Sequence, residues 1–158
     1  EGGWYYEQIE LGLNYRLTEM QPALGLSQLR RLDAFLSRRR ELVARYDRLL
    51  AEVPVTRPLT DLIDESAWHL YVIRIDPSQA GKTRRQVYDA MRAAGIGVQV
   101  HYIPVHLQPY YRALGFKPGH CPEAERYSEE ALSLPLYPAL SDGEQEQVVA
   151  ALRASLES

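Results

Sequence analysis

Cysteine is almost absent from this 158-residue sequence, in which Cys121 is the only one. A lone cysteine cannot form an internal disulfide, and so little cysteine is typical of a protein from a reducing compartment. The chain begins E-G-G-W, which is neither a methionine start nor a signal peptide. We therefore predict a cytoplasmic protein. The start of the sequence fits either a processed chain or a piece of a longer protein.

The sequence also lacks an excess of positive charge and lacks long apolar runs. The formal net charge is −3 and the pI is about 5.8, so no general positive field attracts nucleic acid or an anionic membrane. No stretch approaches the roughly 18 apolar residues of a membrane-spanning helix. We therefore expect neither nucleic acid nor a membrane as a partner. The 46% hydrophobic and 25% charged residues that are present predict a single folded domain.

A long helical pattern occupies much of the first third of the chain. From Thr18 to about Val53, apolar residues recur at steps of three to seven with arginines and acids between them, which predicts an amphipathic helix with room for one break. Thr18 and Gln21 have the spacing of a capping box, which would start the helix at Thr18. Pro22 lacks a backbone N–H, so the residue at which the helix starts is not fixed by this pattern. Residues 1–17 have aromatic residues beside glycines and are predicted to be an irregular connector.

Two strands are predicted further on, at residues 67–75 and 97–103, from branched and aromatic content and from alternation. Helices are predicted after Thr83 as far as Gly95, at residues 109–114 and 122–132, and from Ser141 to Leu152. This order predicts an α/β or α+β fold in which a short sheet is covered on one face by helices. The first helix is longer than so small a sheet requires, so part of it should pack against another domain or subunit.

The histidines and the cysteine do not form a metal-binding pattern. The histidines are His69, His101, His106 and His120, the last of them next to Cys121. Structural zinc sites use paired ligands at short fixed separations, and none of these spacings matches. We predict no metal site and an unreactive thiol.

Two segments are candidate binding sites by residue type. Residues 12–16 place the amide of Asn14 and the guanidinium of Arg16 on a connector that begins with glycine, and such groups hold phosphates. An arginine that holds a turn through carbonyls is the competing interpretation. Residues 98–111 contain two histidines, three tyrosines and two prolines, which suit a pocket for a hydroxyl-bearing ring but also fill small cores. Composition leaves both interpretations open.

Four segments in order carry a resemblance to a known family: G-L-N-Y-R-L-T-E-M-Q-P-A-L-G-L-S-Q-L, H-L-Y-V-I-R-I, G-I-G-V-Q-V-H-Y-I-P-V-H-L-Q-P-Y-Y and S-L-P-L-Y-P. Together they resemble the C-terminal portion of the DegT/DnrJ/EryC1/StrS sugar aminotransferases over nearly the whole chain. The segment rich in histidine, tyrosine and proline is most similar to the branch that makes UDP-4-amino-4,6-dideoxy-N-acetyl-altrosamine for pseudaminic acid.

The resemblance implies a fold, a cofactor and partners. The family's fold resembles aspartate aminotransferase (fold type I), in which a large domain binds pyridoxal phosphate and a small domain closes the substrate cleft of a homodimer. Residues 1–17 would then connect to a large domain, and residues 18–158 would be the C-terminal small domain. The expected partners are a nucleotide-sugar substrate, an amino donor, the protein's own large domain and a second subunit.

The resemblance also implies roles for residues. Asn14 and Arg16 would contact the cofactor phosphate or the substrate, with Asn14 reaching the neighbouring subunit's site. His101 and Tyr102 would face the sugar, and substrate contacts are expected at His106 and Tyr110 of the same segment.

Lysine is also scarce, and its positions limit what the chain can do. Aminotransfer requires a lysine that holds the cofactor as a Schiff base, yet Lys82 and Lys117 are the only lysines and neither matches the family's lysine motif. We therefore expect no catalytic residue in this chain and no activity without the large domain. The alternative is a stand-alone dimerisation or sugar-binding module, which predicts a reading frame that begins close to Glu1.

Overall fold

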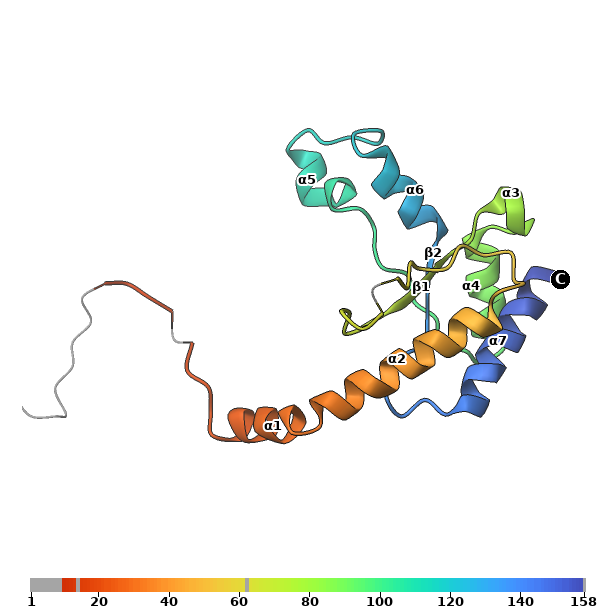
Figure 1. Ribbon diagram of the computed structural model, residues 1–158. Coiled ribbons are helices and arrows are strands. Elements are labelled where there is room, and N and C mark those ends of the chain that lie inside the picture. The colour runs from red at the N-terminus through yellow and green to blue at the C-terminus, as the bar shows by residue number, and fades with distance from the viewer. Residues whose placement is uncertain (1–9, 14, 62, 158) are drawn as a thin grey trace, which may run out of the picture. The chain divides into compact units, whose positions relative to one another are not determined.

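The computed structural model describes residues 10–13, 15–61 and 63–157 (Figure 1). The chain divides into two units, Glu1–Asp33 and Ala34–Ser158. Within the described residues, no helix is long and apolar enough to cross a membrane.

The first unit contains helix α1, Met20–Leu29. The side chain of Gln21 accepts a hydrogen bond from the backbone N–H of Thr18 at 2.8 Å, which is one half of the expected capping box. Pro22 lies in the first turn, where a helix does not need the missing N–H. No residue of α1 is buried, and its large apolar side chains are all more than half exposed: Met20, Leu24, Leu26 and Leu29. The described part of this unit therefore has no core of its own.

The predicted long helix is broken once, as expected, between α1 and α2. Helix α2 spans Leu32–Leu49, and the turn residues Arg30 and Arg31 separate the two helices. Leu42, Val43 and Tyr46 lie on one stripe of α2 and are fully buried, as the helical period requires.

Arginines on the polar side of α2 bind backbone carbonyls of the second unit. Arg39 donates from Nη1 to three carbonyls, those of Trp68, His69 and Leu136. Arg38 donates to the carbonyl of Leu140 and to the carboxylate of Asp142, at 2.9 and 2.8 Å. The two side chains therefore tie α2 to loops distant in the sequence.

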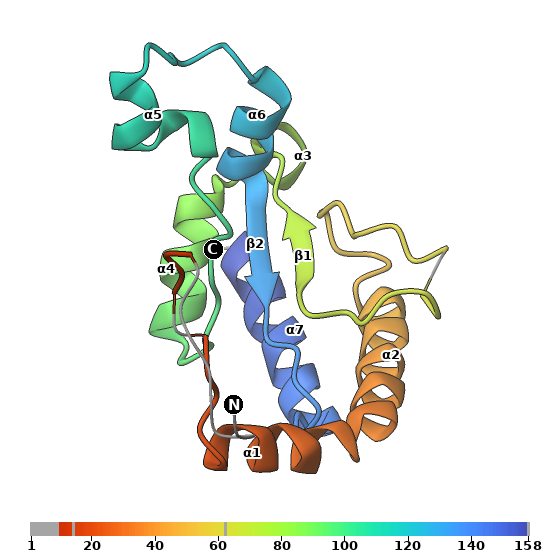
Figure 2. The same cartoon turned by 90° about the vertical axis from the view of Figure 1, so that its left-hand side faces the viewer.

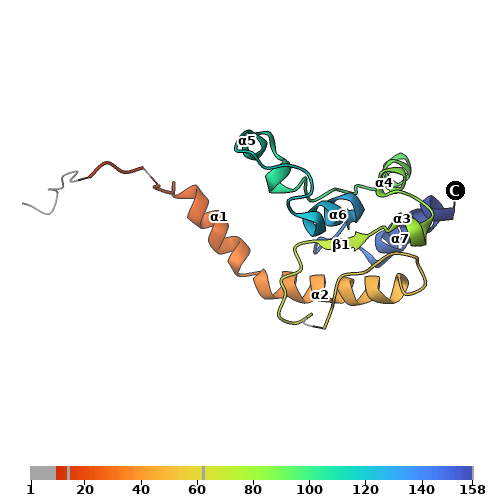
Figure 3. The same cartoon turned by 90° about the horizontal axis from the view of Figure 1, so that it is seen from above.

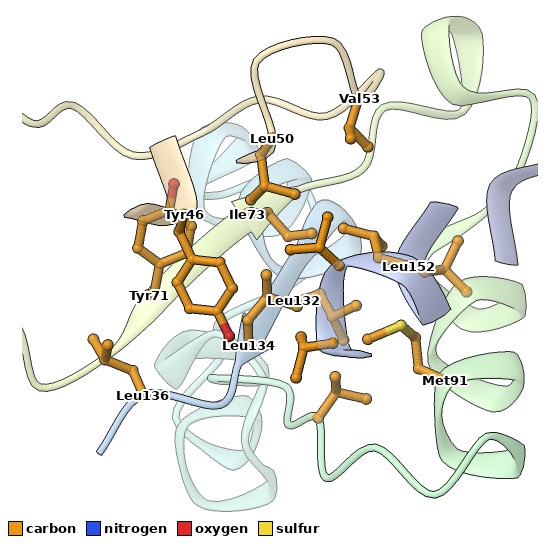
Figure 4. Packing of buried hydrophobic residues seen from close by; sticks show 14 of the residues in the cluster. Tyr46, Leu50, Val53, Tyr71, Ile73, Met91, Leu132, Leu134, Leu136 and Leu152 are labelled. Carbon is orange, nitrogen blue, oxygen red and sulfur yellow. The ribbon is translucent and has the colours of Figure 1, made fainter. Parts of the chain in front are cut away.

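Strands β1, Tyr71–Arg74, and β2, Ala131–Leu134, form an antiparallel pair (Figure 2). Tyr71 pairs with Leu134 and Ile73 with Leu132, so these four side chains share one face of the pair. All four belong to the hydrophobic core, together with residues of α2, α4 (Arg84–Ala93) and α7 (Asp142–Glu157) (Figure 4). A mostly helical domain with a two-stranded sheet covered by helices confirms the predicted fold class.

The remaining helices are short. They are α3 (Pro77–Ala80), the 3-10 helix η1 (Val105–Leu107), α5 (Pro109–Ala113) and α6 (Pro122–Glu130). Helices α5 and α6 lie on the other side of the strand pair from α2 (Figure 3). The helices predicted after Thr83 and from Ser141 are both present, and each begins with a capping box. Gly95 follows α4 with a φ of +79°, a conformation that glycine adopts readily.

The strand predicted at residues 97–103 is wrong. Only Gln99 pairs, through an isolated bridge to Ser133 with hydrogen bonds of 3.2 and 2.8 Å. Hydrogen-bonded pairs in an antiparallel ladder recur every second residue, so the next two would involve Pro135 and Ala131. Proline has no N–H to donate, and the N–H of Ala131 already bonds the carbonyl of Tyr127. The ladder therefore stops after one pair.

Two other predicted boundaries differ from the structure. The helix predicted at residues 122–132 ends at Glu130, because residues 131–134 pair with β1 and Ile75 bonds the carbonyl of Glu130 at 2.9 Å. The strand predicted at residues 67–75 begins only at Tyr71. The carbonyls of Trp68 and His69 accept from Arg39. Tertiary contacts override the local pattern in both places.

Candidate functional site

His101 is held beside β2 at the end of the segment that contains Gln99. Its Nδ1 lies 2.8 Å from Oγ of Ser133, and its ring meets the ring of Tyr102 edge to face with centroids 4.5 Å apart. The His101 side chain is half-buried. Among the described residues, Nε2 of this ring has no hydrogen-bond partner, so Nε2 is the ring nitrogen left to meet a ligand.

Tyr102 and Tyr110 are both exposed, at 72% and 71%. Tyr110 makes an edge contact with Tyr111, with centroids 5.4 Å apart. No ring contact or hydrogen bond between described residues joins Tyr110 to His101. The structure thus brings His101 and Tyr102 together, while the substrate contact predicted at Tyr110 stays a prediction.

His106 occupies a different environment from His101. It lies in η1, is only 8% exposed, and its Nε2 is 2.8 Å from Oε1 of Glu125 on α6. The same carboxylate accepts the backbone N–H of Gly119 at 2.8 Å and that of Cys121 at 3.4 Å. Glu125 therefore joins η1, the turn before α6 and α6 itself. The substrate contact predicted at His106 is untested, and the ring nitrogen bonded to Glu125 is already engaged.

Hydrogen bonding perturbs the Glu125 carboxyl. The bond from His106, followed by those from Gly119 and Cys121, lowers the pKa of Glu125 because each donor stabilises the charged form. A lowered pKa in the folded state means that the contribution to stability is present above the ordinary pKa of glutamate. That contribution is lost as the pH falls through the lowered pKa.

Replacing Glu125 by glutamine should loosen the turn before α6 at neutral pH. A neutral amide accepts the three N–H groups more weakly than a carboxylate, so the amide hydrogens of Gly119 and Cys121 should exchange faster. Hydrogen exchange followed by mass spectrometry measures this, and acidification of the unmodified protein should lower the protection of the same amides relative to their intrinsic exchange rate at each pH. Glu123→Gln on the same helix is the control, because Glu123 is exposed and, among the described residues, pairs only with Arg126. Equal exchange in both variants would contradict this role of Glu125.

The predicted phosphate contacts lie in the first unit. Asn14 is outside the described residues, and Arg16 is exposed on the connector before α1. Lys82 is half-buried just before α4, and Lys117 is exposed in the turn before α6. The roles of Asn14 and Arg16 therefore remain predictions.

Two residues of this region, Ser133 and Glu125, are not predicted as site residues by the sequence. Ser133 lies within the S-L-P-L-Y-P segment, and only the bridge to Gln99 shows that it faces His101. Glu125 is one of several acids between residues 123 and 130, so nothing local distinguishes it. Among the described residues, no group of three or more histidine, cysteine, aspartate or glutamate side chains is placed to hold a metal.

A hollow of about 460 Å³ lies away from these residues, between the C-terminal ends of α2 and α7. Its walls are built by Glu52, Val53, Pro54, Arg153, Leu156 and Glu157. None of the predicted site residues lines it.

Comparison with known proteins relates most of the chain to one family. Residues 2–153 match the model of the DegT/DnrJ/EryC1/StrS aminotransferase family. The spore coat polysaccharide biosynthesis protein SpsC of Bacillus subtilis is 41% identical over 96% of this chain. The chain spans 40% of the length of that relative.

Solved structures agree with the sequence comparison. The sugar aminotransferase Spr1654 of Streptococcus pneumoniae, solved in forms with pyridoxal phosphate and with pyridoxamine phosphate, is 30% identical with a TM-score of 0.88. In the pyridoxal phosphate form the match covers 99% of this chain and 40% of that one. PseC of Helicobacter pylori, an aminotransferase of pseudoaminic acid biosynthesis, is 28% identical with the same TM-score over 99% of this chain and 42% of its own. The chain belongs to the DegT/DnrJ/EryC1/StrS aminotransferase family and corresponds to the C-terminal portion of its members.

Proposed function

We propose that this chain is the C-terminal small domain of a pyridoxal-phosphate-dependent nucleotide-sugar aminotransferase. The intact enzyme transfers an amino group from glutamate to the 4-keto carbon of a 6-deoxy UDP-sugar, for pseudaminic acid or another surface polysaccharide. The observation that carries the proposal is the fold match to Spr1654, which covers 99% of the chain in the pyridoxal phosphate form and 98% in the pyridoxamine phosphate form. The identity to PseC, 28%, is no higher than that to Spr1654, 30%. The identities therefore do not single out pseudaminic acid, and this product is a finer proposal than the aminotransferase reaction itself.

The residues of this chain do not by themselves fit the cofactor. Pyridoxal phosphate supplies the electron sink for amino transfer when it is held by a lysine. Lys82 lies before α4 and Lys117 before α6, and neither lines the hollow between the C-terminal ends of α2 and α7. Arg16 can contribute a guanidinium to a phosphate, and Asn14 can contribute an amide. The proposal therefore places the lysine and most of the cofactor site in the large domain.

The small domain's own contribution is to bind and orient the sugar. His101 and Tyr102 form one cluster, and its polar tips are Nε2 of His101 and the phenol oxygen of Tyr102, a residue that is 72% exposed. An imidazole N–H and a phenol both hydrogen-bond hydroxyl groups. These residues would orient a substrate ring, with His106 and Tyr110 as further contacts in the same segment.

The first unit supports the proposed partners. The apolar side chains of α1 are exposed within the described chain, and exposed apolar patches of several hundred Å² mark interaction sites. We assign this surface to the enzyme's large domain and to a second subunit, in a homodimer.

The proposal is tested with the intact gene product. Glutamate and a UDP-4-keto-6-deoxy sugar should yield a UDP-amino sugar, detected by mass spectrometry. The chain described here, mixed with pyridoxal phosphate, should show no saturable visible absorption band that depends on Lys82 or Lys117. A band lost in Lys82→Ala or in Lys117→Ala would contradict the placement of the cofactor lysine in the large domain. The reading frame upstream of Glu1 distinguishes the alternative of a stand-alone dimerisation or sugar-binding module.

A further inference from the structure

Ser133 lies on the face of the strand pair that points away from the hydrophobic core. Its neighbours Leu132 and Leu134 belong to the core, so the side chain of Ser133 points to the opposite face. Gln99 is directly across from Ser133, and His101 is two residues further along the same segment. Diagonal neighbours on one face of a strand pair are within reach of a long side chain. The 2.8 Å contact between Oγ of Ser133 and Nδ1 of His101 follows from this register.

The Ser133 hydroxyl has one partner among the described residues, and that partner is His101. Ser133 is only 4% exposed, so water does not readily replace this partner. A buried hydroxyl that fails to donate its proton is costly, whereas an unused oxygen lone pair is tolerated more easily. The hydroxyl therefore donates to Nδ1, which must then be the unprotonated ring nitrogen of neutral His101.

We propose that Ser133 is a positioning residue that fixes both the orientation and the tautomer of His101. The proton of the neutral ring is kept on Nε2, so His101 presents a hydrogen-bond donor to its ligand. This inference rests on the proposed function, in which that ligand is the nucleotide sugar. An oxygen of the sugar then accepts from Nε2–H. A ring free to rotate or to change tautomer would present this donor for only part of the time.

The first test reads the tautomer and does not depend on activity. The intact protein is labelled with nitrogen-15 in its histidines, and the His101 signals are assigned from the spectrum of His101→Gln. At about pH 8.5 a histidine in water is neutral, and long-range proton–nitrogen correlations then show which ring nitrogen is protonated. We expect a single Nε2–H form in the unmodified protein and a mixture of tautomers in Ser133→Ala. An Nδ1–H form, or no change in Ser133→Ala, would overturn the inference.

Ser155→Ala is the matched control for this experiment. Ser155 is likewise buried, 5% exposed, and its hydroxyl donates to the carbonyl of Leu152. Ser155→Ala thus removes the same hydroxyl group from a comparably buried site on α7, away from His101. It should leave the His101 tautomer and the kinetics unchanged, and a change in the tautomer equal to that in Ser133→Ala would also overturn the inference.

A kinetic cycle separates this inference from the proposed function. Ser133→Ala should lower kcat/KM for the nucleotide sugar about three- to tenfold, the effect of one weakened hydrogen bond. In a His101→Ala background, Ser133→Ala should have no further effect, because Ser133 acts through His101. A further loss of similar size would refute the positioning role. A tautomer change without any aminotransferase activity would leave the positioning role standing and remove the proposed function.

Discussion

Replacing Leu132 by alanine should lower the free energy of unfolding by about 2–5 kcal/mol, the range for truncating a fully buried leucine. Leu132 has no exposed surface, pairs with Ile73 across the sheet and belongs to the core shared with α2, α4 and α7 (Figure 4). The cavity would open where the strand pair meets these helices. Since folded domains are stable by only about 5–15 kcal/mol, the variant should unfold at much lower urea concentration.

Leu114→Ala is the control for Leu132→Ala. Leu114 follows α5 and is 63% exposed, so this truncation should change stability by less than about 0.5 kcal/mol. Urea unfolding followed by circular dichroism measures both variants, with the slope of the transition used to check that the unfolding mechanism is unchanged. Similar midpoints for the two variants would contradict the position of Leu132 at the centre of the core.

Replacing Asn14 by alanine should reduce cofactor retention or turnover of the intact enzyme by about ten- to a hundredfold. This is the effect of losing a hydrogen bond to a charged group, and it follows from the proposed contact between Asn14 and the cofactor phosphate or substrate. His101→Ala should instead impair nucleotide-sugar kinetics and leave the cofactor's visible spectrum intact. Steady-state kinetics and absorption spectra of both variants measure the difference. A normal spectrum and normal turnover in Asn14→Ala would remove the proposed contact.

Mixed dimers test whether Asn14 serves the neighbouring subunit. Subunits with Asn14→Ala are combined with subunits that lack the cofactor lysine, and the mixed dimers are isolated with two affinity tags. If Asn14 reaches across the dimer, one site carries both defects and the other carries neither, so activity partly returns. Mixed dimers without recovered activity would refute the contact across the interface. Sedimentation of the intact protein as a strict monomer would refute the dimer itself.

Local patterns in the sequence were sufficient for features whose causes are local. The capping boxes at Thr83 and Ser141 form within one helical turn, and the sequence shows both partners. The buried stripe of α2 follows from helical periodicity. The four ordered motifs were enough to indicate the family, which the match to residues 2–153 shows.

Patterns that depend on distant partners were misread. Residues 131 and 132 continue the predicted helical pattern, but pairing with β1 places them in strand β2. Residues 97–103 alternate like a strand, yet Pro135 and the engaged N–H of Ala131 leave Gln99 as the single paired residue. In each case the contact that decides the structure comes from a segment distant in the sequence. A pattern of neighbouring residues does not contain that information.

The candidate site divides in the same way. The sequence by itself showed the residues that the family resemblance assigns to a sugar, His101 and Tyr102, and showed that Lys82 and Lys117 are its only lysines. Only the tertiary structure decided that His101 is bonded to Ser133 while His106 is bonded to Glu125. The two histidines are five positions apart, and their different environments arise because hydrogen bonds of 2.8 Å require partners that only the folded chain brings together.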